Sequence, residues 1–274
     1  MIEEELMKHG ERGGLRRIER AGVALVGDVE GPVSFGFTER TGGVSRAPFA
    51  SLNLGAHVDD DPAAVAENRR RVLAALGAES LSDRLVVPNQ VHGDHVVTIA
   101  DGSPAALEAA RAEAAAGADA VVCTAPDVPV LLCFADCVPC ILVAPQAFAV
   151  VHSGWKGTFA GIAGKAARVL MERAGCAPSG IAAYIGPHIL GDEYEVSDEL
   201  MERFRTRFPD VAVGKGRLLD LSECIRFSLV EAGLSPDAIF DPQLSTMREN
   251  DRFYSYRAES GRCGRHGAVA VLAG

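Results

Sequence analysis

The sequence has no stretch that would place it in or across a membrane. A spanning helix needs about 20 consecutive apolar residues, whereas the longest apolar runs, near Val128 and Val138, are interrupted by Asp136 and by prolines. The first ten residues, MIEEELMKHG, are acidic and lack the apolar core of a secretory signal. We therefore expect a cytoplasmic protein with no membrane partner.

The sequence also lacks an even number of regularly spaced cysteines. The chain has seven cysteines dispersed over 274 residues. An odd number without an export signal favours reduced thiols over a disulfide framework. Any cysteine with a special role would then serve a metal or catalysis.

Basic charge is scarce as well. Lys and Arg number 27 against 37 Asp and Glu, which gives a net charge of -10. Nucleic-acid binding needs basic patches that displace counterions, so we expect no nucleic-acid partner. A small phosphorylated ligand, held by a few local arginines, remains compatible with this balance.

Linkers, charge blocks and internal repeats are absent after the first 20 or so residues. The hydrophobic content of 48% fits an ordinary globular protein. We therefore predict a charged N-terminal tail or helix at 1–22 and a single catalytic domain at 23–274.

Several familiar catalytic motifs do not occur. The chain has no G-x-x-x-x-G-K-[ST] phosphate loop, no H-E-x-x-H zinc helix and no G-x-S-x-G nucleophile turn. The P-C-x-x-C pair of zinc deaminases is absent too, because Pro139-Cys140 is followed by Ile, Leu and Val. Any active site must therefore be built from less familiar patterns.

Hydrophobic periodicity and capping residues predict the secondary structure. Helices are expected at 61–77, 103–117, 158–174, 197–208 and 220–233. Strands are expected at 33–37, 85–87, 95–99, 120–123, 130–135, 138–143, 147–152, 181–185, 253–256 and 268–272. Tight connections between 120 and 152 indicate antiparallel neighbours, and helices gather in separate blocks. The fold class is therefore α+β, with a mixed or antiparallel sheet covered by helices.

Two histidines and a cysteine interrupt this apolar pattern. If 138–143 and 147–152 form a hairpin, Cys137 and His152 lie together at its open end. His92, in the segment NQVHG, supplies a second imidazole. Two imidazoles and a thiolate suit a catalytic zinc site with an open fourth position, and they also suit copper. The alternative is that Cys137 is a small core residue and that both histidines are buried with their polar atoms hydrogen-bonded within the protein.

Two other interpretations use the same cysteine. Cys137-Val-Pro-Cys140 has the spacing of a redox pair, but positions three apart on a strand face opposite sides, so Cys140 should point away. Cys137 could instead be a nucleophile with His152 as its base. In that case Asp136 or Asn89 could complete the set.

Further polar clusters are candidates for substrate contacts. Arg40 and Arg46 flank the glycine turn at 41–45 and could bind phosphate, although such a pattern is also typical of an ordinary turn. His188 follows a predicted strand in IGPH. The segment FYSYR offers Tyr254, Tyr256 and Arg257 as an aromatic wall with a guanidinium, or a half-buried strand.

Together these segments resemble a known family. FTERTGGVS, SLNLGAHVDDDPAAVAENRRRV, NQVHGDHV, ADCVP, VHSGWKGT, IGPHI with YEV, and FYSYR with GR occur in this order. They resemble the YfiH-like family, also called the laccase-domain, polyphenol-oxidase or peptidoglycan-editing-factor family, from about residue 33 onward. The resemblance implies a single-domain four-layer α/β/β/α sandwich with mixed sheets, similar to the catalytic domain of cytotoxic necrotizing factors.

The resemblance also implies chemistry. It implies zinc bound by His92, Cys137 and His152, and phosphorolysis of adenosine, inosine and methylthioadenosine accompanied by adenosine deamination. Copper-dependent laccase activity and editing of peptidoglycan precursors are also attached to the family. The implied partners are a nucleoside and phosphate, and the protein is expected to be a monomer or homodimer.

The family motifs give the full set of candidate residues. We expect His92, Cys137, His152 and Asp136 to be catalytic. The candidates for substrate binding are Arg40, Arg46, Asn53, Gln90, His188, Tyr254, Tyr256 and Arg257. Two departures from the common pattern stand out, HSGWKG for HAGWRG and Leu244-Ser245-Thr246 for a cysteine-threonine pair.

Overall fold

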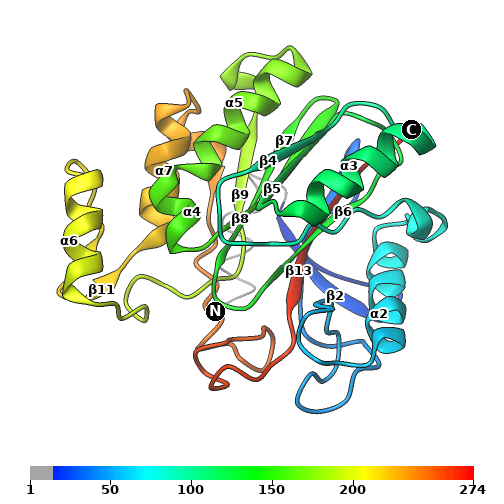
Figure 1. Ribbon diagram of the computed structural model, residues 1–274, viewed down its shortest axis with the longest axis horizontal. Helices are drawn as coiled ribbons and strands as arrows, with labels where there is room; N and C mark the ends of the chain where they lie inside the picture. Colours follow the sequence, from blue (N-terminus) through cyan, green and yellow to red (C-terminus); the bar gives the residue numbers. More distant parts are fainter. Residues whose placement is uncertain (1–14) are drawn as a thin grey trace.

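Two β-sheets dominate the computed structural model, which describes residues 15–274 (Figure 1). The first sheet is antiparallel throughout, and its strands in spatial order are β1 (Arg16–Arg20), β2 (Val23–Asp28), β3 (Val33–Thr38), β13 (His266–Leu272) and β6 (Val130–Phe134). The second sheet is mixed, with the order β12 (Ile239–Phe240), β9 (Ala182–Ile185), β7 (Val138–Ala144), β8 (Ala147–Ser153), β5 (Ala120–Cys123) and β4 (Val96–Ile99). The α+β class with mixed sheets is confirmed.

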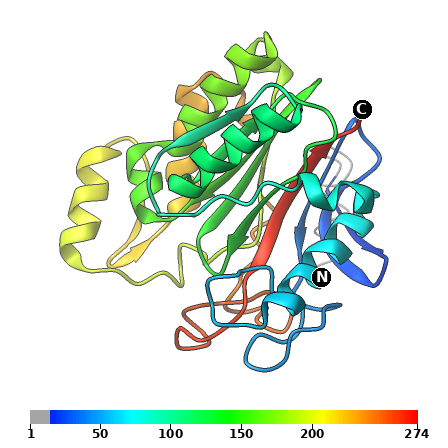
Figure 2. The same cartoon turned by 45° about the vertical axis from the view of Figure 1, so that its right-hand side comes forward.

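Helices gather in separate groups (Figures 1 and 2). The α-helices are α2 (Pro62–Ala75), α3 (Pro104–Ala116), α4 (Trp155–Ala160), α5 (Ile162–Ala174), α6 (Asp198–Arg207) and α7 (Leu221–Glu231). Short 3-10 helices are η1 (Glu79–Arg84), η2 (Pro178–Gly180) and η3 (Pro236–Ala238), and β10 (Gly214–Lys215) pairs with β11 (Leu218–Leu219). No helix in residues 15–274 is long and apolar enough to traverse a bilayer.

Three buried clusters form the core. The first contains inward-facing side chains of both sheets, such as Phe37 from β3 and Phe148 from β8. The second lies under α5, α6 and α7 and includes Phe204. The third includes residues of α2 and the first sheet, such as Leu73 and Val269.

Helix starts follow the predicted capping residues. The Ser197 and Asp220 side chains accept hydrogen bonds from backbone N–H groups at the first turns of α6 and α7. The helix predicted at 158–174 is instead two helices, α4 and α5. Gly161 separates them, and its φ of 75° is a left-handed conformation that glycine adopts without steric cost.

Several predicted elements are corrected by the structure. The segment 253–256 is not a strand, because Phe253 and Arg252 bond back to the Glu249 carbonyl in a turn. The segment 85–87 is reduced to a single bridge between Val86 and Val130. Residues 16–20 form a strand and not a tail or helix, whereas the rest of that predicted tail, 1–14, lies outside the described residues.

The predicted hairpin that positions the candidate site is confirmed. β7 and β8 pair antiparallel from Ala144↔Ala147 at the turn to Val138↔Ser153 at the open end. Cys137 immediately precedes this end. β6 does not join this sheet but pairs with β13 in the other one, so the run of strands from 120 to 152 is divided between the two sheets.

Candidate active site

The three predicted metal ligands lie together. His92 comes from the loop before β4, Cys137 from the residue before β7, and His152 from β8. Their ligand atoms all lie within 4.8 Å of one another, and the two imidazole rings meet edge to face with centroids 4.8 Å apart. Two nitrogens and a sulfur at this spacing fit one metal ion that keeps an open coordination position.

A buried carboxylate behind these ligands fixes their orientation. Asp119 accepts hydrogen bonds from the backbone N–H groups of Val91, His92 and Gly93 at 3.2, 3.0 and 2.7 Å. It also accepts from Nδ1 of His152 at 2.7 Å, which leaves Nε2 of that ring for a metal. Carboxylates of this kind set the tautomer of a metal-binding histidine. Sequence reasoning missed Asp119, whose only signal was a single acid before an apolar run.

Electrostatics favour a thiolate at Cys137. Burial alone would raise its pKa, but the neighbouring imidazoles of His152 and His92 outweigh burial and lower the pKa to about 6. Burial would lower the pKa of His152, but the Cys137 thiolate and Asp119 raise it above its usual range. Metals bind the thiolate and not the thiol, so this cysteine is prepared for a metal ion near neutral pH.

Glycines in HSGWKG let the ligands approach one another. A Cβ on Gly154 would lie 3.1 Å from both Sγ of Cys137 and Cδ2 of His92. A Cβ on Gly157 would lie 3.0 Å from the carbonyl oxygen of Gly93. The first glycine therefore leaves room for the ligand atoms, and the second lets α4 pack against the His92 loop.

Asp136 lines the site but its carboxylate is already engaged. One oxygen accepts a hydrogen bond from Oγ1 of Thr246, and the other accepts from the backbone N–H of Arg257, both at 2.7 Å. The carboxylate thereby holds two distant segments against the site. This anchoring gives Thr246 a structural role, while a catalytic role for Asp136 stays a prediction.

The ligands open into a cavity of about 980 Å³. This is at the upper end of the range for small-molecule pockets, which runs from about 300 to 1,000 Å³. Aromatic side chains of Phe134, Trp155, Tyr194 and Tyr256 line part of it. The aromatic surface provides flat apolar area against which a planar ligand can stack.

Three basic side chains in the same wall were missed by sequence reasoning. We call His57, Arg69 and Arg265 the anion cluster. Within residues 15–274 neither arginine forms an ion pair with a carboxylate; both donate to backbone carbonyls, Arg69 to Leu54 and Arg265 to residues 263 and 264. Guanidinium groups that have no acid partner are typical ligands of anions in proteins.

Three of the predicted substrate-binding residues also line the cavity. The Gln90 side chain donates to the Cys133 carbonyl and accepts from the Cys133 N–H, which ties the His92 loop to β6. Tyr256 is 54% exposed at the wall. The Arg257 guanidinium lies 5.4 Å from the ring centre of Tyr194. The structure thus brings these three into the same cavity as the metal ligands.

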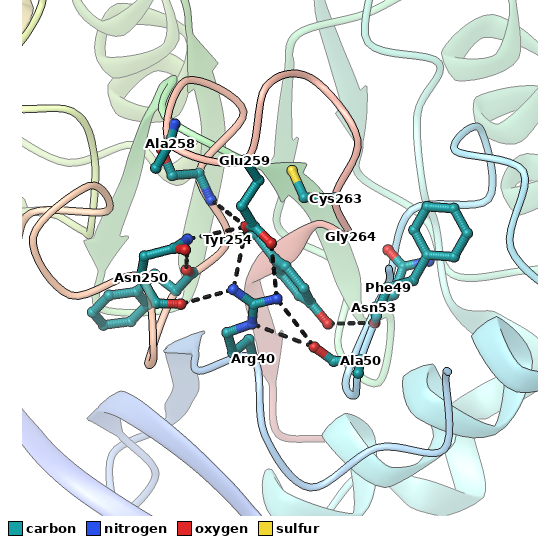
Figure 3. A network of polar contacts seen from close by, with 12 residues as sticks. Arg40, Phe49, Ala50, Asn53, Asn250, Tyr254, Ala258, Glu259, Cys263 and Gly264 are labelled. Atoms are coloured by element: carbon teal, nitrogen blue, oxygen red, sulfur yellow. Dashed lines mark hydrogen bonds and ion pairs between the residues drawn. The ribbon is translucent and has the colours of Figure 1, made fainter. Parts of the chain in front are cut away.

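Two predicted substrate contacts, Arg40 and Tyr254, do not line the cavity. The Arg40 guanidinium pairs with both oxygens of Glu259 at 3.2 and 3.0 Å and lies 4.2 Å from the Tyr254 ring centre (Figure 3). Tyr254 is fully buried, and its hydroxyl donates to the Phe49 carbonyl at 2.6 Å. We call Arg40, Asn250, Tyr254 and Glu259 the brace, because they join the 40–54 loop to the 250–264 loop.

The remaining three candidates also lie outside the wall. Arg46 is exposed on its loop. Asn53 is buried, and its amide makes only intramolecular hydrogen bonds. His188 is buried with Nδ1 bonded to the Gly186 carbonyl. None of these three side chains is part of the cavity lining.

Cys140 lies on the opposite face of β7 from Cys137, as predicted. It is buried in the cluster beneath α5, and burial raises its pKa to about 12. All seven cysteines are unpaired. The redox-pair interpretation is therefore not supported by the geometry.

Comparison with known proteins identifies the family. The family model "Multi-copper polyphenol oxidoreductase laccase" matches residues 34–273. Purine nucleoside phosphorylase YlmD of Geobacillus stearothermophilus is 38% identical over 241 residues, which cover 84% of this chain and 86% of that protein. Purine nucleoside phosphorylase of Deinococcus radiodurans is 38% identical over 245 residues, which cover 88% of this chain and 89% of that protein.

Solved structures agree with this assignment. The crystal structure of YlmD from Geobacillus stearothermophilus superimposes with a TM-score of 0.82 at 33% identity, covering 95% of this chain and 99% of that one. The Bacillus licheniformis hypothetical protein YfiH gives a TM-score of 0.81 at 32% identity, covering 93% and 98%. This chain therefore belongs to the YfiH-like, laccase-domain family.

Proposed function

We propose that this protein is a metal-dependent purine nucleoside phosphorylase. The observation that carries the proposal is one cavity that contains both the His92–Cys137–His152 set and two arginines without carboxylate partners among residues 15–274. Phosphorolysis needs a site for an anionic nucleophile beside a site for the nucleoside. The names of the curated relatives support the same reaction class.

The anion cluster is the proposed phosphate site. Guanidinium groups bind phosphate oxygens through paired N–H donors. Arg69 and Arg265 each keep donors that are not used in the fold, since their bonds to backbone carbonyls engage only part of each fork. Phosphate bound here would be desolvated next to the metal ligands and oriented for attack on the sugar carbon.

The aromatic wall is the proposed nucleoside site. Tyr194, Trp155 and Tyr256 line the cavity together with Cys137 and offer ring faces to a purine. Burial raises the pKa of Tyr194, and the charge of the Cys137 thiolate raises it further. Arg257 at this wall can donate to a purine or ribose oxygen. The base would thus stack at one part of the cavity while phosphate binds at another.

The donor set suits zinc as the resident metal. Two imidazoles and a thiolate would hold a zinc ion and leave a position for water or substrate, and zinc bound there would supply Lewis acidity and lower the pKa of a bound water. This water chemistry would also serve the proposed adenosine deaminase activity. His152 is held by Asp119 and His92 by its backbone bond to the same carboxylate, so the ligands are preorganised.

The decisive experiment measures phosphate-dependent release of hypoxanthine from inosine by purified protein of known metal content. We expect turnover that requires both phosphate and about one equivalent of zinc. Adenosine and methylthioadenosine are the next substrates to assay, with inosine formation as the readout for deamination. Base release that does not depend on phosphate would contradict the proposal.

A Cys-His hydrolase is a second candidate, because the same residues form a nucleophile, base and carboxylate set. The Cys137 thiol has a lowered pKa, and His152 is hydrogen-bonded to Asp119. An amidase activity on peptidoglycan precursors that resists a chelator but is blocked by thiol alkylation would favour this candidate.

A copper oxidoreductase is supported only by the wording of the matching family model. Multicopper chemistry needs several ligand clusters. Among residues 15–274 the set of His92, Cys137 and His152 is the single such group. Zinc without copper in protein purified from unsupplemented medium would exclude an oxidase.

Three further predictions, on the layering of the fold, the location and the oligomeric state, remain proposals. The core clusters support a four-layer α/β/β/α arrangement similar to cytotoxic necrotizing factors, which a structural superposition with such a domain would test. The unpaired cysteines support a cytoplasmic location. A monomer or homodimer is expected, and light scattering would distinguish them.

A further inference from the structure

The short segment Asn53-Leu54-Gly55 lies directly behind the anion cluster. We propose that Asn53 is a positioning residue, whose amide fixes the backbone of Arg265 and so sets the geometry of the phosphate site. The inference rests on the proposed function, because it assigns phosphate as the ligand of that site. Asn53 itself does not line the cavity and acts only through its neighbours.

Asn53 holds Arg265 through a buried hydrogen bond. Its Oδ1 accepts from the backbone N–H of Arg265 at 2.8 Å and from that of Gly55 at 3.0 Å. The next residue, Leu54, donates its backbone N–H to the Arg265 carbonyl at 3.0 Å. Both polar groups of the Arg265 backbone are therefore bound to a two-residue segment 212 positions earlier in the chain.

The same segment holds the second arginine. The Leu54 carbonyl accepts from Nε and Nη2 of Arg69 at 3.0 and 2.8 Å. Arg69 is on α2 and Arg265 precedes β13, so nothing in the local sequence relates them. The segment of Asn53 and Leu54 therefore holds both the Arg69 guanidinium and the backbone from which the Arg265 side chain extends.

Gly55 provides the space that this arrangement needs. A Cβ on Gly55 would lie 2.8 Å from Cγ of Arg265, 3.1 Å from its Cβ and 3.3 Å from Cε1 of His57. Alanine could therefore not be accommodated without displacing members of the anion cluster. The glycine and the asparagine act on the same side chains by different means, one by close approach and the other by hydrogen bonds.

The orientation of the Asn53 amide is fixed by an acid. Its Nδ2 donates to Oδ2 of Asp60 at 2.8 Å and to the Gly55 carbonyl at 3.2 Å. The side chain thus needs a donor on one side and an acceptor on the other, which only an amide supplies. An aspartate would place two carboxylates together, and an alanine would leave the buried N–H of Arg265 without its acceptor.

The test compares Asn53→Ala and Gly55→Ala with a matched control, Asn250→Ala. Asn250 belongs to the brace, where its amide donates to the Phe253 carbonyl and to Glu259, and it has no bond to the anion cluster (Figure 3). Each variant is assayed for KM of phosphate, KM of inosine, kcat and the rise in Tm that inorganic phosphate produces.

We expect both test variants to raise the KM for phosphate about tenfold or more, as small displacements of binding groups do. The KM for inosine should change less than twofold, and the stabilisation by phosphate should be lost. Asn250→Ala should lower Tm while leaving the KM for phosphate unchanged. If Asn53→Ala does not fold, Gly55→Ala carries the test, because it retains the asparagine side chain and its four hydrogen-bond partners.

Equal KM values for phosphate in the two test variants and the control would overturn the inference, since Asn53 would then only stabilise the fold. This outcome is distinct from failure of the proposed function, in which the unaltered protein itself shows no dependence on phosphate. The thermal shift with phosphate reports on the anion cluster in either case.

Discussion

Arg40 and Arg69 are both part of conspicuous basic motifs in the first 71 residues of the chain, but they have opposite environments. The Arg40 side chain is 15% exposed and is neutralised by Glu259, whose side chain is 19% exposed. Arg69 lines the cavity, and no carboxylate within residues 15–274 pairs with it. The brace thus uses its arginine to join two loops, whereas the anion cluster leaves its arginines available to a ligand.

The comparison shows that a partner distant in sequence decides the role of a charged residue. Glu259 is 219 positions after Arg40, so the glycine turn at 41–45 looks like an anion site until the fold brings the acid to it. The cysteines of β7 show the same contrast. Cys137 faces two imidazoles, while Cys140, three positions later, is buried among apolar side chains.

The largest effect is expected from the cysteine pair. Cys137→Ala should lose bound metal and nucleoside phosphorolysis together, because it removes the anionic ligand from the set. Cys140→Ala should keep metal and activity and lower stability by about 1 kcal/mol, as loss of a small buried group does. Metal content by mass spectrometry and turnover of inosine are measured on the same samples.

Activity in a metal-free Cys137→Ala protein would show that the metal mechanism is wrong. Loss of metal from Cys140→Ala would instead show that the two cysteines do not have separate roles. The Cys140 variant is also the control for folding, since Cys140 lies in β7 and Cys137 immediately precedes that strand.

The next largest effects are expected from substitutions of Arg69 and Arg40, which should differ in kind. Arg69→Met should lower kcat/KM for phosphate by a factor equivalent to about 2 kcal/mol, the size of a hydrogen bond to a charged group. Its effect on stability should be the smaller one, because only the Leu54 carbonyl loses its donor. Arg40→Met should do the reverse and lower the free energy of unfolding by about 3 kcal/mol, because the Glu259 carboxylate is left without its partner. Denaturant unfolding and steady-state kinetics on both variants provide the measurement.

The Arg69→Met and Arg40→Met variants should differ in phenotype, one in phosphate kinetics and the other in stability. If Arg40→Met also raised the KM for phosphate as much as Arg69→Met, the brace would have to be counted with the binding machinery. Tyr254→Phe should lower the free energy of unfolding by less than Arg40→Met does, since it removes only the hydroxyl that bonds to the Phe49 carbonyl.

Local patterns predicted the candidate metal ligands and most of the elements around them. The hairpin register follows from the apolar runs on either side of Pro145, so the sequence alone places Cys137 and His152 together. The strand predicted at 253–256 is wrong because the N–H groups of Arg252 and Phe253 bond to the Glu249 carbonyl in a turn. Tyr254 is buried there through its hydrogen bond to the Phe49 carbonyl, a contact between distant segments.

The anion cluster could not be predicted for a related reason. Arg69 occurs in the run ENRRRV, where three neighbouring arginines are indistinguishable in sequence. Arg70 and Arg71 pair with Glu67, while Arg69 points toward Leu54 and the cavity. Only the packing of α2 against the segment at 53–55 selects which of them faces the ligand.

A smaller, pH-dependent effect is expected at His57. Desolvation at the cavity wall, together with the charges of Arg265 and Arg69, lowers the pKa of this imidazole and so favours its neutral form in the free protein. An anion bound to the cluster favours the imidazolium and raises its pKa. Binding should therefore take up protons and become tighter as pH falls.

Calorimetry with sulfate in two buffers of different ionisation enthalpy measures this uptake, and sulfate is used because it does not titrate near neutrality. The uptake should vanish in His57→Gln while sulfate still binds to the two arginines. Equal binding enthalpies in the two buffers for the unaltered protein would mean that His57 does not respond to the anion.

The smallest effect is expected at Arg46, and it completes the comparison between arginines. Arg46 flanks the same glycine turn as Arg40, but it is exposed and does not line the cavity. Surface substitutions without such contacts usually change stability by less than about 0.5 kcal/mol. Arg46→Gln should therefore leave the KM for phosphate, the KM for inosine and Tm unchanged. A raised KM for phosphate in this variant would mean that the 41–46 loop closes over the cavity when substrate binds, and the division between brace and anion cluster would then hold only for the free protein.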